Sequence, residues 1–193
     1  LTPLLPRFRQ AHPDISLEIA IDDAAVDITE RGFDAGIRIG EAVEKDMIAV
    51  RLTPDITWAV VGSPSYFIKR GRPQTPEELT RHEAIRYRYP ASGTIYRWEF
   101  EREGRDFSVD VPGGLTVNDS QMLVEMAEAG IGLAYLPDLS VHDAVASGRL
   151  ERVLEAHLPT SPGLFIYFPA KAQTQPKLRA FLDLAARIAR ERR

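Results

Sequence analysis

Residues 115–137, which read LTVNDSQMLVEMAEAGIGLAYLP, constrain the fold of this chain more than any other stretch. The pattern predicts a strand, a polar turn, an amphipathic helix that Gly130 ends, and an apolar strand. Asn118, Asp119 and Ser120 lie where the first strand ends and the helix begins, and these residue types commonly cap helix N-termini. This order of elements indicates an α/β domain.

The junction between this strand and this helix is also a candidate binding site. Open α/β sheets bind ligands at the carboxyl ends of their strands, because backbone N–H groups and the positive end of a helix dipole point outward there. The alternative is an ordinary βαβ unit whose cap only stabilises the helix. The junction alone leaves both interpretations open.

The rest of the chain alternates strand-like and helical patterns in the same way. Alternating or short apolar runs predict strands at 15–21, 33–39, 48–52, 56–61, 84–87, 97–100, 107–111, 150–154 and 164–168. Helical spacing and capping residues predict helices over 1–12, over 24–31, from Ser63 to Gly71, after a capping box at 75–78, from Asp138 to Gly148, and from Pro176 onward. Because a parallel α/β domain rarely starts on a helix, we expect a first strand to be missing before Leu1.

The order of the elements predicts a chain that leaves one lobe and later returns to it. Residues 1–59 supply the first set of strands and helices, and residues 60–164 supply a second set. The last strand and helix, within 165–193, complete the first lobe. Extended crossings near 57–61 and 163–168 would form a hinge. The alternative is one continuous doubly wound sheet.

Composition limits the classes of protein that this chain can be. It has no cysteine, which excludes disulfides, thiolate metal sites and a cysteine nucleophile. A net charge of −4 makes the chain by itself a poor ligand for nucleic acid. No apolar run reaches the roughly 18 residues of a membrane span, and no signal peptide is visible. We therefore expect a cytoplasmic protein without a membrane association.

The sequence gives no indication of an enzyme. The histidines at 12, 82, 142 and 157 are scattered and fit no metal-binding spacing. There is no G-x-S-x-G nucleophile motif and no P-loop, and the Gly130-Ile131-Gly132 run lacks the third glycine of a dinucleotide fingerprint. We expect no catalytic residue, no metal and no cofactor.

Several runs together resemble one known family. These runs are LPRFRQAHPDISLEI, DITERGFDAGIRIG, VNDSQMLVEMAEAGIGLAYLP, SGRLERVL and TQPKLRAFLDLAARIA. In this order they resemble the effector-binding (regulatory) domain of LysR-type transcriptional regulators, over essentially the whole chain. The resemblance implies a type 2 periplasmic-binding-protein fold, in which two Rossmann-like α/β lobes are joined by a two-strand hinge. It also implies that an N-terminal winged helix-turn-helix domain is absent from this chain.

The resemblance implies that a small, anionic or aromatic effector binds in a cleft between the lobes. It assigns the effector contacts to loops at the ends of strands, with these candidate residues: Asp23, Arg38, Gly40, Tyr87, Asn118, Asp119 and Ser120. The physical argument is clearest for the last three, at a helix N-terminus.

The other candidates have alternatives that the sequence leaves open. Arg38 could bind a carboxylate in a bidentate manner or form an ion pair with a neighbouring acidic residue. Tyr87 could stack on an aromatic effector or belong to the core. Asp23 could contact the effector or cap the helix that follows it.

The resemblance also implies partners. The regulatory lobes would form a homodimer or homotetramer, and DNA would bind only through the absent N-terminal domain. The first helix, around Leu5 and Phe8, and the helix with Met122 and Met126 are candidate interfaces, although these apolar faces could also be core. The main alternative is a monomeric periplasmic solute-binding protein of the same fold. A third possibility is an enzyme that reuses this fold.

Overall fold

The computed structural model describes residues 4–21, 28–40, 46–90 and 92–191. The chain divides into two compact units. Unit 1 contains the described residues up to Asp55 and those from Pro162 onward, and unit 2 contains Ile56–Ser161. The chain therefore enters unit 2 after Asp55 and returns to unit 1 after Ser161.

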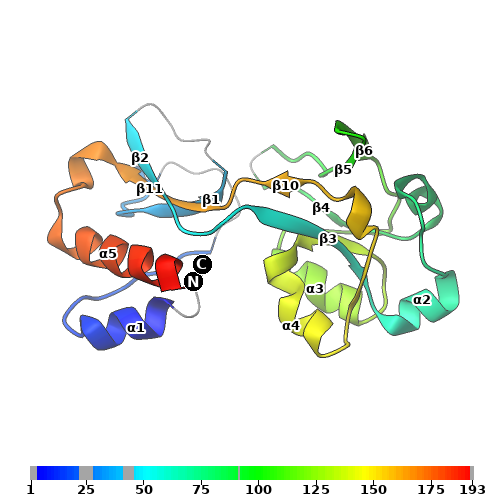
Figure 1. The fold of residues 1–193 in the computed structure, drawn as a ribbon, viewed down its shortest axis with the longest axis horizontal. Helices are drawn as coiled ribbons and strands as arrows, with labels where there is room; N and C mark the ends of the chain where they lie inside the picture. The colour runs from blue at the N-terminus through cyan, green and yellow to red at the C-terminus, as the bar shows by residue number, and fades with distance from the viewer. Residues whose placement is uncertain (1–3, 22–27, 41–45, 91, 192–193) are drawn as a thin grey trace. The chain divides into compact units, whose positions relative to one another are not determined.

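Unit 1 is built on a three-stranded antiparallel sheet with the strand order β1-β11-β2. The strands are β1 (Gly36–Ile39), β2 (Met47–Arg51) and β11 (Leu164–Pro169). Helices α1 (Leu4–Ala11) and α5 (Pro176–Glu191) lie side by side along one side of this sheet (Figure 1). A short 3-10 turn, Ala170–Ala172, joins β11 to the segment before α5.

The two helices of unit 1 share a core. The side chain of Phe8 is fully buried, and its ring meets the ring of Phe181 edge to face at 5.2 Å between centroids. Leu184 and Ile188 pack in the same cluster. Phe8 is therefore a core residue, and its proposed role in an interface is wrong, because this side chain has no surface to offer. Leu5 is half-buried.

The predicted strand at 15–21 is not formed. The segment is irregular, and Ile21 is 90% exposed. An alternating pattern fits extended backbone, but a strand also needs a hydrogen-bonded neighbour. No strand within the described parts of the chain pairs with this segment. Of the helix predicted over 24–31, residues 28–31 form a turn and the others lie outside the described residues.

Unit 2 contains a mixed sheet in which β3 (Ile56–Gly62) runs antiparallel to β8 (Ala134–Pro137). A parallel bridge from Ala84 to Leu133 continues the sheet from β8 to β4 (Ile85–Tyr87). Strand β4 in turn pairs in parallel with β7 (Leu115–Val117). On its other side β3 pairs with the short strands β9 (Glu151–Val153) and β10 (Thr160–Ser161).

Each face of this sheet has its own core. Helices α3 (Ser120–Glu128) and α4 (Asp138–Ala146) cover one face, where Leu123 and Leu136 are buried (Figure 1). The remaining elements of unit 2 are α2 (Pro64–Arg70), the 3-10 turns η1 (Pro76–Arg81) and η2 (Glu155–His157), and the hairpin of β5 (Trp98–Arg102) and β6 (Arg105–Val109). Side chains from α2, η1 and β5 pack on the opposite face, against Val60 and Tyr135.

Local sequence signals account for some of these elements better than for others. The predicted hairpin is confirmed: Glu103 and Gly104 both have positive φ angles, of 53° and 72°, as a tight two-residue turn requires. The capping box at Thr75 precedes a 3-10 turn rather than an α-helix, and Thr75 makes no side-chain cap. Asp138 does not cap α4, because its carboxylate pairs instead with Arg152 at 2.6 Å.

Candidate functional site

The strands of unit 2 bring the predicted loops to one edge of the sheet. Because β7, β4 and β8 are parallel, their carboxyl ends lie at the same edge. Trp58, near the start of the antiparallel β3, pairs there with Pro137 at the end of β8. We call this edge, marked by Asn118, Tyr87, Pro137 and Trp58, the carboxyl edge of unit 2. It is the part of an α/β sheet at which ligands bind.

Helix α3 begins at the carboxyl edge. Asp119 is its N-cap, and its Oδ1 accepts a hydrogen bond from the backbone N–H of Met122 at 2.7 Å. The capping role predicted for this triplet is thus confirmed for Asp119. Asn118 is exposed and Ser120 is half-buried, so the start of the helix reaches the surface. The first N–H groups of any helix lack partners within the helix, which makes this position suited to a carboxylate.

The loop after β4 lies beside the start of α3. The Arg88 N–H donates to the carbonyl of Val117 at 2.7 Å, which ties the end of β4 to the end of β7. The Tyr96 N–H donates to the carbonyl of Tyr87 at 2.8 Å, so the loop folds back on β4. The structure therefore brings Tyr87 together with Asn118, Asp119 and Ser120.

Aromatic side chains gather on the other side of the same edge, and sequence reasoning did not group them. We define the aromatic cluster as Trp58, Tyr89, Tyr96 and Tyr135. Trp58 stacks on Tyr135 with 5.0 Å between ring centroids, and Tyr96 lies 5.6 Å from Tyr135. Tyr89 meets Tyr96 edge to face at 5.7 Å and reaches Tyr87 at 5.6 Å. The signal available in the sequence was two tyrosines in the loop that follows a predicted strand.

Glu99 holds the phenols of this cluster in place. Its Oε2 accepts a hydrogen bond from the Tyr96 hydroxyl at 3.0 Å, and its backbone carbonyl accepts one from the Tyr135 hydroxyl at 2.8 Å. Burial raises the pKa of the Tyr96 and Tyr135 phenols, and the charge of Glu99 raises them further. Both phenols therefore stay protonated and act as donors at neutral pH.

Arg38 and Gly40 are the described candidate residues of unit 1. The Arg38 guanidinium lies over the ring of Tyr167, 5.1 Å from its centroid. That ring also covers Gly36, where an added Cβ would lie 2.3 Å from Tyr167 Cζ. The Gly40 N–H donates to the Gly163 carbonyl at 3.0 Å, and Gly40 has a φ of +82°. Asp23 lies outside the described residues.

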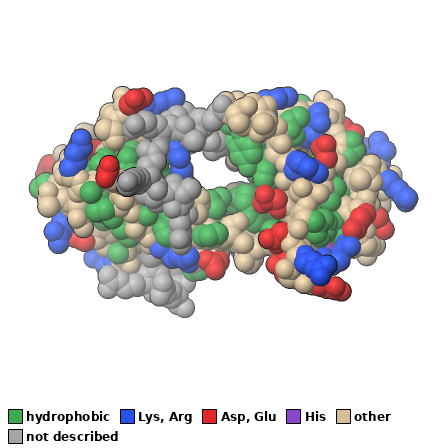
Figure 2. Space-filling view, turned by 90° about the horizontal axis from the view of Figure 1, so that it is seen from above, with side chains coloured by type: hydrophobic (Ala, Val, Ile, Leu, Met, Phe, Trp, Pro, Cys, Tyr) green, Lys and Arg blue, Asp and Glu red, His purple; other side chains and the backbone are tan. Residues whose placement is uncertain are grey.

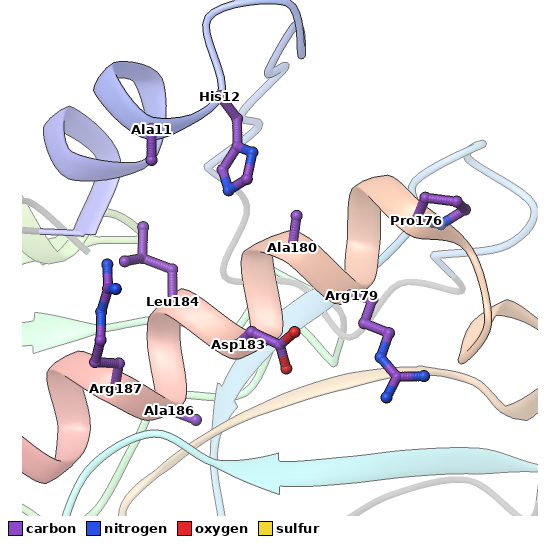
Figure 3. A pocket seen from close by; sticks show the side chains of 9 residues that line it. All are labelled: Ala11, His12, Pro176, Arg179, Ala180, Asp183, Leu184, Ala186 and Arg187. Carbon is purple, nitrogen blue, oxygen red and sulfur yellow. The ribbon is translucent and has the colours of Figure 1, made fainter.

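A groove of about 1070 Å³ lies elsewhere in unit 1, between α1 and α5 (Figure 3). Apolar side chains line it together with Arg179, Asp183 and Arg187, and His12 points toward α5 from the end of α1. None of the candidate residues named above contributes to it. Within the described parts of the chain, no three His, Asp or Glu residues are placed to hold a metal ion, and no helix is long and apolar enough to cross a membrane.

Comparison with known proteins agrees with this architecture. The chain is 39% identical over 183 residues to the HTH-type transcriptional regulator PgrR of Escherichia coli K12, which covers 95% of this chain and 61% of that protein. It is 40% identical over 192 residues to a transcriptional regulator of Pseudomonas aeruginosa, covering 100% of this chain and 61% of that protein. The chain thus spans about three fifths of the length of these relatives.

The solved structures give the fold. The regulatory domain of CrgA, a LysR-type transcriptional regulator from Neisseria meningitidis, superimposes with a TM-score of 0.85 at 24% identity, covering 97% of this chain and 91% of that one. The fold is therefore the type 2 periplasmic-binding-protein fold of such regulatory domains, as predicted. The family of LysR substrate binding domains matches residues 1–190. The chain belongs to the LysR substrate-binding domain family.

Proposed function

We propose that this chain is the sensor part of a transcriptional regulator and that its small-molecule effector contacts the carboxyl edge of unit 2. The observation that carries the proposal is the meeting of two strand ends with a helix start. The end of β4 at Tyr87 lies beside the end of β7, and α3 starts immediately afterwards. Asn118 and Ser120 are the residues that we assign to effector binding.

Asp119 has a different part in this proposal. Its carboxylate already accepts the Met122 N–H, so it fixes the first turn of α3. A carboxylate of the effector would then bind at the start of that turn, in the field of the helix dipole. Tyr87 would support the effector from the neighbouring strand. Arg38 and Gly40 of unit 1 stay candidates on the strength of the family resemblance alone.

The full-length protein would act on DNA through a domain that this chain does not include. The two relatives named above are transcriptional regulators, and each is longer than this chain. They support this interpretation over the alternative of a periplasmic solute-binding protein. Effector binding would shift the population of regulatory-domain conformations within a homodimer or homotetramer, and so change how the DNA-binding domains are held. Met122, which is 40% exposed on α3, is our candidate for the contact between chains.

A ligand screen with matched variants tests the proposal. Organic acids and aromatic acids are screened for compounds that raise the Tm of the chain. We expect Asn118→Ala and Ser120→Ala each to reduce the stabilisation by a positive compound. The matched control is Ser140→Ala, an exposed serine of α4. Equal stabilisation of all variants would show that the effector binds elsewhere.

A further inference from the structure

We propose that the aromatic cluster, together with Glu99, receives a cationic group of the effector, such as a substituted ammonium. This inference rests on the proposed function, because it adds a second contact to the same carboxyl edge. An effector that satisfied both contacts would carry a carboxylate and an ammonium group. The class of ligand would then be zwitterionic rather than purely anionic.

The first argument is that rings of the aromatic cluster are exposed. Tyr89 is 41% exposed, and Trp58 and Tyr96 are half-buried, so rings of the cluster reach the surface. In unit 2 hydrophobic side chains reach the surface with both acidic and basic side chains among them (Figure 2). The faces of aromatic rings carry partial negative charge and attract cations that approach within about 6 Å of the ring centre.

The second argument is charge. Glu99 is exposed, and its carboxylate is bonded to Tyr96 and raises the pKa of Tyr89, Tyr96 and Tyr135. Glu99 Oε2 lies 3.0 Å from the Tyr96 hydroxyl, and the backbone oxygen of Glu99 lies 2.8 Å from the Tyr135 hydroxyl. Among the described residues, no Lys or Arg forms an ion pair with Glu99. A carboxylate beside several aromatic faces attracts a cation and disfavours an anion.

The third argument is a contrast with other aromatic rings of the same molecule. Arginines lie over four of them: Arg38 over Tyr167, Arg51 over Phe165, Arg72 over Phe67 and Arg102 over Phe107. None of these contacts within the described parts of the chain involves the aromatic cluster. Arg88, the cation nearest to Tyr89 in the sequence, donates instead to the Gly93 carbonyl at 2.5 Å. Among the described residues, no arginine therefore covers a ring of the aromatic cluster.

Two probes of the same shape test the inference. Choline carries a quaternary ammonium group, and 3,3-dimethylbutan-1-ol is its neutral carbon analogue. Each is titrated into the 193-residue chain while the indole N–H resonance of Trp58 is followed by NMR. Trp98 is 2% exposed and stacks on Tyr135 at 5.6 Å between ring centroids, so its indole resonance should move less than that of Trp58. We expect choline to bind more tightly than the alcohol, by roughly 2- to 30-fold.

Matched variants assign the effect to the cluster. Glu99→Gln should lower the ratio of the two affinities, although the rings still favour the cation, whereas Glu101→Gln, two residues along the same strand, should leave their ratio unchanged. Tyr89→Leu should weaken choline binding, and Tyr89→Phe should largely keep it because the ring remains. Equal affinities for the two probes, or no movement of the Trp58 resonance with either, would overturn the inference.

The carboxylate contact of the proposed function and the cation contact inferred here can each be wrong without the other. Asn118→Ala and Ser120→Ala should leave choline binding intact, because choline has no carboxylate. If choline binds as expected but no organic acid depends on Asn118 or Ser120, the carboxylate contact is wrong and the cation contact stands. If organic acids depend on those residues and choline does not bind, only the cation contact is wrong.

Discussion

The carboxylate of Asp119 accepts a hydrogen bond from the backbone N–H of Met122, with 2.7 Å between Oδ1 and the nitrogen. This bond satisfies one of the donors at the start of α3 and places a fixed negative charge at the end of the helix dipole. The start of α3 is therefore held rigidly before any effector arrives. Asp119 contributes to the stability of unit 2, whereas Asn118 and Ser120 are assigned to recognition.

Asp119→Ala should lower the free energy of unfolding of unit 2 by about 1 kcal/mol, because alanine has no capping oxygen. Asp119→Asn should cost much less, because asparagine also caps helices. Urea unfolding, monitored by tryptophan fluorescence, measures both changes in unfolding free energy, since Trp58 and Trp98 both lie in unit 2. A loss as large for asparagine as for alanine would mean that the charge matters rather than the hydrogen bond.

Phe8→Ala should lower the free energy of unfolding of unit 1 by about 3–5 kcal/mol, because it removes a fully buried ring that packs on Phe181. Circular dichroism during thermal or urea unfolding reports this loss. An effect of less than about 1 kcal/mol would contradict the core position of Phe8.

Met122→Glu tests the proposed contact between chains. Met122 is 40% exposed, so the change should alter the free energy of unfolding by no more than about 0.5 kcal/mol. Sedimentation velocity should nevertheless show weaker self-association, because a charge at the centre of an interface is costly. If the unchanged chain is a strict monomer at micromolar concentration, or if the variant associates equally well, Met122 lies outside any interface.

Gly36→Ala should destabilise unit 1 by about 1–3 kcal/mol, because the new Cβ would overlap the ring of Tyr167. A double-mutant cycle with Tyr167→Ala checks the cause. The cost of Gly36→Ala should fall markedly when the ring is absent. An unchanged cost would place the strain in the backbone instead.

The stability of unit 2 should depend on the protonation of His82. Burial lowers the pKa of His82 below its usual 6.5, and Glu78 opposes this shift only in part. The unfolded chain therefore binds more protons than the folded chain between the lowered pKa and 6.5, so stability falls as the pH is lowered through that window. His82→Gln should reduce the difference in unfolding free energy between about pH 7.5 and about pH 5. A pH dependence that is the same in both proteins would show that other groups cause it.

Local patterns predicted those parts of the fold that depend on neighbouring residues. The hairpin turn at Glu103 and Gly104 needs only residues that tolerate positive φ, and the cap of α3 needs only Asp119 and the helix after it. The prediction of a strand at 15–21 was wrong for the opposite reason. Its alternation is visible in the sequence, but a strand also depends on a neighbour from elsewhere in the chain.

Only the part of the candidate site at the start of α3 was predictable from the sequence. The start of α3 is contiguous in sequence, so Asn118, Asp119 and Ser120 could be named together. The aromatic cluster joins Trp58, Tyr89, Tyr96 and Tyr135, which two separate strands and a loop bring to the same edge. Nothing in the local pattern around Trp58 or Tyr135 distinguishes them from ordinary core aromatics, so their grouping required the fold.

The most direct test of the account is to map effector binding on the backbone amides by NMR. The ligand is the compound that most raises the Tm of the chain. We predict that the largest shift changes occur at the amides of Ser120 and Gln121 and in the loop from Arg88 to Tyr96, together with the indole N–H of Trp58. Shift changes concentrated instead along the groove between α1 and α5, with the carboxyl edge of unit 2 unaffected, would contradict the account.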